Sequence, residues 1–174
     1  MNKKIVLILF ILTAIFLEFL RDYLFVNINL QIQFINQINN GYDAVNYTDS
    51  SILNLTEDFT VQNLKVLKWS MTLFFFTLFV LLGIMFSYVI WDKKTAKKFS
   101  KLYFFSGLTL FITGFIFFVL GLLLNTENRF NFYYISLELS HFVQSTLYPI
   151  TFLLVFYAYR KMIIKPKYLS LIHI

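Results

Sequence analysis

Four long apolar stretches alternate with polar segments along the chain, at residues 5–25, 69–91, 102–124 and 134–159. Each supplies the roughly 20 residues that a helix needs to cross a hydrocarbon core. The pattern predicts an all-α membrane protein in which four transmembrane helices form a bundle, with residues 1–174 as a single membrane domain. Glu18 closes the first stretch and no small-x-small cleavage motif follows it, which favours an uncleaved span over a signal peptide.

The longest polar segment, residues 27–68, lies between the first two stretches. Polar and apolar residues alternate over 27–34, which is a strand pattern. No turn residue separates this segment from the first stretch, however, and its apolar residues also fit a helical stripe. We therefore expect a helix that continues to about Asn40 and ends at Gly41 as its C-terminal cap.

A second helix is expected to lead into the stretch at 69–91, with Asp58 or Thr60 as its N-cap. The helices of the first two spans would then extend outward beyond the bilayer as an antiparallel helical hairpin. At 1.5 Å per residue the first extension reaches about 20 Å. Residues 41–59, rich in Asn, Asp, Ser and Thr, would form its tip.

The composition supports this assignment. Apolar residues make up 59% of the chain and charged residues 14%, against about 45–50% and about 25% in soluble domains. A small water-soluble domain cannot bury that much apolar surface. Soluble enzymes, disordered chains and nucleic-acid-binding modules are excluded, and the absence of Cys excludes disulfides and thiolate metal sites.

The basic residues are sorted along the sequence. The N-terminus, the loop 92–101 and the tail 160–174 hold 11 of the 15 Lys and Arg residues. Because cytoplasmic loops carry an excess of Lys and Arg, both termini are expected in the cytoplasm, with the protein in the inner or plasma membrane. The basic loop would face anionic lipid, so it requires no nucleic-acid partner.

Aromatic residues gather near the predicted span ends, as expected for an interfacial belt: Tyr88, Trp69, Trp91, Tyr103, Tyr133, Tyr134, Tyr157 and Tyr159. In the third span, Gly107, Gly114 and Gly121 are spaced by seven and share one helix face. Small residues let helix backbones approach closely. This stripe predicts a tight helix-packing seam, with a hinge or a ligand groove as the alternatives.

Two predicted spans from opposite ends of the chain carry a polar intramembrane cluster: Glu18, Arg21, Asp22, Glu138, His141 and Gln144. Counted inward from the outer ends of their spans, Glu18 and His141 lie about 10 Å deep, and Arg21 and Glu138 about 6 Å. Ionisable residues inside spans are costly and usually face the bundle interior or water. We therefore expect the two helices to bring this cluster to one outer-leaflet level.

Three interpretations of the cluster remain open. The favoured one is structural, with Arg21 paired to Glu138 and Glu18 paired to His141. A proton or ion relay is the second, because partly buried Glu and His can titrate near neutrality. A metal site on the Glu138-x-x-His141 spacing is the third, and the lack of a second His ligand counts against it.

Pro149 lies within the fourth stretch and predicts a kink there, which would either widen a cavity at His141 or fit a curved bundle. No phosphate-binding, metalloprotease or nucleophile-elbow motif occurs, and no cofactor is expected. The leading hypothesis is a non-enzymatic subunit or assembly factor of a larger membrane complex. The alternative is a component of a proton- or ion-coupled transporter or channel, and an intramembrane enzyme ranks third.

Overall fold

The computed structural model describes residues 3–124 and 128–169, and every regular element in these two segments is a helix. The helices are α1 (Lys3–Asn39), α2 (Ser50–Thr56), α3 (Val61–Ile90), α4 (Lys93–Leu123), α5 (Asn128–Val143) and α6 (Leu147–Leu169). The all-α class expected from the sequence is confirmed. The last part of the expected cytoplasmic tail, residues 170–174, lies outside the described residues.

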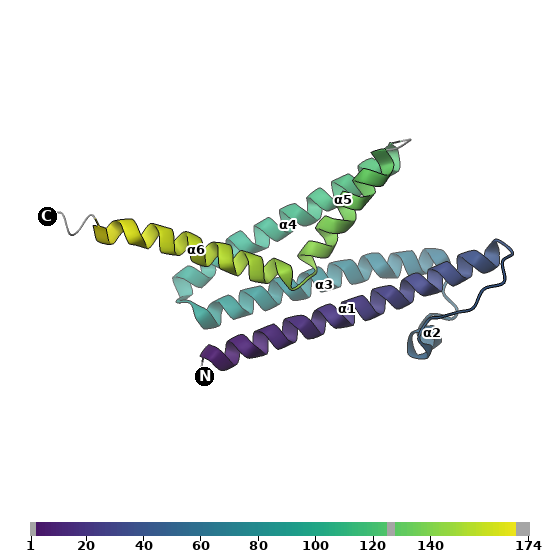
Figure 1. Cartoon of the computed structure of the whole chain (residues 1–174), viewed down its shortest axis with the longest axis horizontal. Coiled ribbons are helices and arrows are strands. Elements are labelled where there is room, and N and C mark those ends of the chain that lie inside the picture. Colours follow the sequence, from purple (N-terminus) through teal and green to yellow (C-terminus); the bar gives the residue numbers. More distant parts are fainter. Residues whose placement is uncertain (1–2, 125–127, 170–174) are drawn as a thin grey trace.

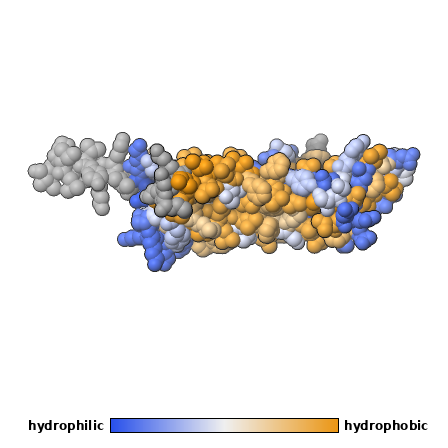
Figure 2. All heavy atoms as spheres, turned by 90° about the horizontal axis from the view of Figure 1, so that it is seen from below, coloured by the Kyte–Doolittle hydropathy of each residue, from blue (hydrophilic) through white to orange (hydrophobic). Residues whose placement is uncertain are grey.

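The helices form two antiparallel pairs, α1 with α3 and α4 with α5 (Figure 1). The pairs diverge toward the end that carries α2, while α6 crosses back along α4. The start of α1, the α3–α4 connection and the far end of α6 all lie at the other end. Figure 2 shows an apolar band across the middle of one face, with hydrophilic residues at both ends.

Helices α3 and α4 are each long and apolar enough to cross a membrane. Residues 130–143 of α5 and 147–162 of α6 meet the same criterion only when taken together, and they are bent by 70°. Two to three of the four predicted spans are therefore supported by length and composition. Helix α1 is not among them, because its uncharged apolar run, residues 5–17, ends at Glu18.

Helix α1 ends where the sequence predicts. Gly41 has a φ of 77°, a conformation that glycine adopts without steric cost. Its N–H donates to the carbonyl of Ile38 (2.9 Å), and the N–H of Tyr42 donates to that of Gln37 (3.0 Å). These two bonds form a Schellman motif. At the other side of the predicted tip, Thr60 caps α3 and accepts a hydrogen bond from the N–H of Asn63 (3.2 Å).

Two local predictions were incomplete. Helix α2 was not expected within the polar tip; it begins at Ser50 and is capped by Asp49, whose side chain accepts from the N–H of Ser51 (2.9 Å). The basic segment 92–101 is not a loop, because residues 93–101 form the first turns of α4. Asp92 caps them through the N–H of Thr95 (3.0 Å). This hydrogen bond lowers the pKa of Asp92, and its negative charge offsets the lysines at the positive end of the helix.

The main apolar core joins α3, α4, α5 and α6 and includes Phe76, Val80, Phe99, Tyr103, Val143, Tyr148 and Phe156. The prediction that Tyr103 belongs to the interfacial belt was wrong. Its ring is fully buried and stacks on that of Tyr148, with centroids 4.6 Å apart. Its hydroxyl donates to the carbonyl of Phe79 (3.0 Å), and the Tyr148 hydroxyl donates to the carbonyl of Tyr103.

Glycines provide the space for this tyrosine pair. A Cβ at Gly83 would lie 2.6 Å from the Tyr103 ring, and one at Gly107 would lie 2.7 Å from the Tyr148 hydroxyl. Gly114 faces α5 instead, where a Cβ would be 3.4 Å from Leu139. Gly121 is buried. The predicted glycine face thus lies against α5 around Gly114 and against the start of α6 around Gly107.

Candidate functional site

The fourth predicted span is broken in two. Helix α5 ends at Val143 and α6 begins at Leu147, with the 70° bend between them. The disturbance predicted from Pro149 is present, but it is a full break one turn before the proline rather than a kink in a continuous helix. In a continuous helix the Pro149 ring would clash with the carbonyl of Ser145. With the break at 144–146, Pro149 lies in the first turn of α6, where its missing N–H is not needed.

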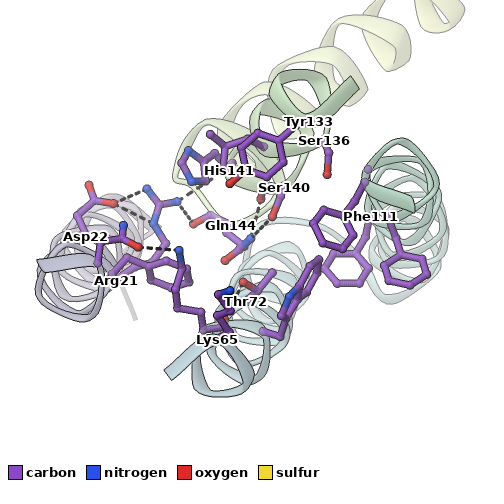
Figure 3. A pocket seen from close by; sticks show the side chains of 18 of the residues that line it. Arg21, Asp22, Lys65, Thr72, Phe111, Tyr133, Ser136, Ser140, His141 and Gln144 are labelled. Atoms are coloured by element: carbon purple, nitrogen blue, oxygen red, sulfur yellow. Dashed lines mark hydrogen bonds and ion pairs between the residues drawn. The ribbon is translucent and has the colours of Figure 1, made fainter. Parts of the chain in front are cut away.

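Arg21 of α1 binds the end of α5 (Figure 3). Its Nη1 donates to the carbonyl oxygens of Gln144 (2.5 Å) and His141 (3.4 Å). Its Nε and Nη2 donate to Oδ1 of Asp22 at 3.0 and 2.6 Å. The Arg21 side chain is only 10% exposed. A cation at a helix C-terminus satisfies free carbonyls and interacts favourably with the helix dipole.

Glu18 lies one turn before Arg21 on α1 and binds the other side of the break. Its Oε2 accepts from the N–H of Thr146 at 3.3 Å, at the start of α6. An anion at a helix N-terminus is favourable for the same electrostatic reason. One helix therefore places an acid at the start of α6 and a base at the end of α5.

Side chains within the break bind the remaining carbonyls there. The Gln144 amide donates to the carbonyl and the hydroxyl of Ser140, both at 2.8 Å. The Ser145 hydroxyl donates to the carbonyl of Phe142 (2.9 Å). Gln144 is 1% exposed. Backbone that leaves the helix inside a membrane protein must find such partners, because lipid offers none.

The two ion pairs expected in the cluster do not form. Arg21 binds Asp22 and backbone carbonyls rather than Glu138, and Glu18 binds a backbone N–H rather than His141. Glu138 is exposed and interacts with the Tyr134 hydroxyl one turn earlier on α5. The depths of the residues indicated that the helices meet, but the break supplied backbone groups that a continuous span would not offer.

A cleft of about 810 Å³ lies beside the break. Four of the six predicted cluster residues line it: Arg21, Asp22, His141 and Gln144. In Figure 3, Arg21 and Asp22 lie on the α1 side, and Tyr133, Ser136, Ser140 and His141 on the opposite, α5 side. Lys65 and Thr72 come from α3, and Phe111 from α4.

Sequence reasoning missed the contribution of α3 to this cleft. Lys65, Lys68, Trp69 and Thr72 all line it. Lys68 donates to Oδ1 of Asn29 on α1 (2.7 Å). The signal was present in the sequence, since spacings of three and four place these residues on one helix face.

The predicted cluster does not form a metal site in the described part of the chain. Among the described side chains, residues 5–124 and 130–162, no three His, Asp or Glu side chains are grouped so that they could hold a metal ion. The pair formed by Glu138 and His141 therefore gains no third ligand there. The polar side chains bind backbone groups of the α5–α6 break, and an open cleft lies beside them.

No known protein family, no curated protein and no solved structure matches this chain significantly. The site must therefore be interpreted from its own geometry.

Proposed function

We propose that the chain is a small, non-enzymatic integral membrane subunit or assembly factor of a larger membrane protein complex. In this proposal it crosses the membrane four times, α5 and α6 together form one broken span, and both termini are cytoplasmic. The hairpin tip then projects on the outer side, where it would contact a protein partner.

The inclusion of α1 as a span is supported by its packing along α3. Phe10 stacks on Phe86 near one end of the pair, with ring centroids 3.9 Å apart. Asn29 accepts from Lys68 toward the other end. If α3 crosses the bilayer, α1 crosses the same thickness beside it. Glu18 and Arg21 are compatible with that position, since both bind groups of the α5–α6 break.

The observation that carries the proposal is the apolar surface of the tip. Six large apolar side chains between residues 38 and 59 are exposed, by 37–74%: Ile38, Tyr42, Val45, Tyr47, Leu55 and Phe59. On a membrane span, exposed apolar side chains contact lipid. This segment lies beyond the predicted spans, where its apolar side chains would contact water. The proposal takes these side chains to act together as one partner surface, since contiguous exposed apolar groups mark protein interfaces.

Partner capture tests the proposal. We expect the intact protein, isolated in mild detergent from its native membrane, to carry a stoichiometric protein partner that mass spectrometry identifies. Replacing Tyr42, Tyr47 and Leu55 by Ser should remove that partner without lowering the stability of the chain. The matched control is Asp43→Ser, which changes an exposed polar residue in the same tip. A partner retained equally by both variants would contradict docking through the tip.

The proposed topology makes a separate prediction. Single cysteines at Ser50 and Lys97 should react with a membrane-impermeant reagent from opposite sides, Ser50 from outside. The native chain has no Cys, so the background is silent. Labelling of both positions from one side would overturn the four-span arrangement.

The alternative function, a proton- or ion-coupled relay, is tested at Glu18. Gln retains an oxygen that can accept from the Thr146 N–H but cannot release a proton. We expect Glu18→Gln to leave stability within about 1 kcal/mol of the native value, and Glu18→Ala to cost more because the N–H loses its acceptor. Under the scaffold proposal, Glu18→Gln keeps its partner and its assembly. Proton flux in proteoliposomes that Glu18→Gln abolishes would instead support the relay.

A further inference from the structure

The cleft beside the helix break has a polar wall with an excess of positive charge. Lys65 and Lys68 of α3 and Arg21 and Asp22 of α1 contribute its charged groups, and His141 lies opposite on α5. Among the side chains that the structure describes, those of residues 5–124 and 130–162, the only ion pair joins Arg21 to Asp22, at 2.6 Å. Asp22 thus compensates Arg21, whereas the two lysines have no carboxylate partner in that part of the chain.

The other wall is aromatic. Trp69 of α3 packs edge-on against two rings of α4, with centroid distances of 4.9 Å to Phe118 and 6.2 Å to Phe115. Phe111 and Gly114 of α4 also line the cleft. The cleft therefore presents cationic groups next to a long apolar surface.

We propose that this cleft is a binding site for one anionic membrane phospholipid. The phosphate group would lie between Lys65 and Lys68, and an acyl chain would run along Trp69 and the phenylalanines of α4. Basic pockets between transmembrane helices bind anionic headgroups on the cytoplasmic side of membranes, and we infer that the same charge pairing acts here at the outer-leaflet level. The inference uses the membrane placement proposed above, but it does not depend on the protein partner.

Three features favour a lipid over a soluble anion or a peptide. Trp69, exposed and apolar, belongs to a helix that can span a membrane, so the aromatic wall is within reach of acyl chains. Lys68 directly precedes the predicted span and Lys65 lies about one turn outside it, which would place both near the level of the phosphate groups. A volume of about 810 Å³ also exceeds what a phosphate ion alone would fill.

Fluorescence quenching provides the test. The chain has two tryptophans, and Trp91 packs on Phe99 and Phe156 away from the cleft. In the full-length Trp91→Phe variant, Trp69 is the sole reporter. The purified protein is placed in bilayers of phosphatidylcholine that contain a minor fraction of lipid with brominated chains. We expect brominated phosphatidylglycerol to quench Trp69 at about tenfold lower mole fraction than brominated phosphatidylcholine.

Charge-neutral variants separate this site from general attraction to the membrane. The double variant Lys65→Gln, Lys68→Gln should remove the preference for the anionic lipid. Lys65→Gln alone should reduce that preference. Because Lys65 is exposed, this single substitution should not disturb folding. The control, Lys97→Gln with Lys98→Gln, removes the same charge from the basic end and should keep the preference. Equal quenching by the two lipids in the native sequence would overturn the proposal. So would a preference that survives the loss of Lys65 and Lys68, or one lost in the control.

Because the protein is purified without a partner, failure of this test leaves the docking proposal standing. Conversely, loss of the partner in the tip variants leaves the lipid site intact, since the tip residues do not line the cleft.

Discussion

Replacing Arg21 by Ala should lower the free energy of unfolding in detergent by about 3 kcal/mol. The guanidinium is buried and donates to the carbonyls of Gln144 and His141 at the end of α5. Without it, these groups lose a charged donor in an apolar setting, where water cannot replace it easily. Thermal or denaturant unfolding of the purified protein measures the loss.

The conservative variant Arg21→Lys should recover only part of this stability. A lysine ammonium is a point charge and cannot bind Asp22 and the helix end in the forked geometry of arginine. Glu138→Ala is the matched control, because Glu138 is exposed and does not contact the break. It should change stability by less than about 0.5 kcal/mol.

Double variants test how the break is held. Arg21→Ala and Glu18→Ala act on the two sides of one break, so the double variant should lose less than the sum of the single losses. Arg21→Ala and Glu138→Ala should be additive, because no contact joins these residues. A non-additive effect of Arg21→Ala and Glu138→Ala would instead indicate that the two side chains form the ion pair expected from the sequence, and would contradict the geometry of the structure.

The second large effect is expected at Gly83. A Cβ there would lie 2.6 Å from the Tyr103 ring. That ring cannot move aside easily, because it stacks on Phe99 and Tyr148 and its hydroxyl binds the carbonyl of Phe79. Gly83→Val should therefore cost about 3 kcal/mol through overpacking, seen as a lower melting temperature.

Gly114→Ala is the control for this variant. The nearest atoms to its new Cβ would be at 3.4 Å or more, an ordinary contact. Alanine also has the higher helix propensity. Stability should stay within about 1 kcal/mol of the native value or rise. An equal loss at both glycines would mean that helix α4 packs differently from the structure.

Local signals in the sequence were sufficient for the elements that depend on nearby residues. Gly41 ends α1 because a left-handed residue is required there, and Thr60 begins α3 because its hydroxyl can cap. Both follow from the chemistry of a few adjacent positions. The apolar stretches likewise predicted α3 and α4. Helix α4 begins at Lys93, before the apolar stretch at 102–124, because Asp92 caps the basic segment as a helix.

The polar cluster shows where such reasoning ends. Depth along two helices suggested that the first and fourth predicted spans meet at one level, and Arg21 does reach the end of α5 there. Depth could not supply Arg21 with its actual partner, since backbone carbonyls become available only after α5 has ended. Pro149 signalled a disturbance, but the break occurs where α6 turns to pack Tyr148 on Tyr103. That contact joins residues 45 positions apart, and no local pattern encodes it.

We infer that α1 holds α5 and α6 in their bent arrangement through Arg21 and Glu18. The most direct test is the distance between spin labels at Phe130 on α5 and Met162 on α6, both well exposed, measured by pulsed electron paramagnetic resonance in lipid. The native protein should give one narrow distribution at the distance set by the 70° bend. Arg21→Ala should broaden this distribution and shift it to longer distances, as the two helices straighten. An unchanged narrow distribution in Arg21→Ala would contradict the claim.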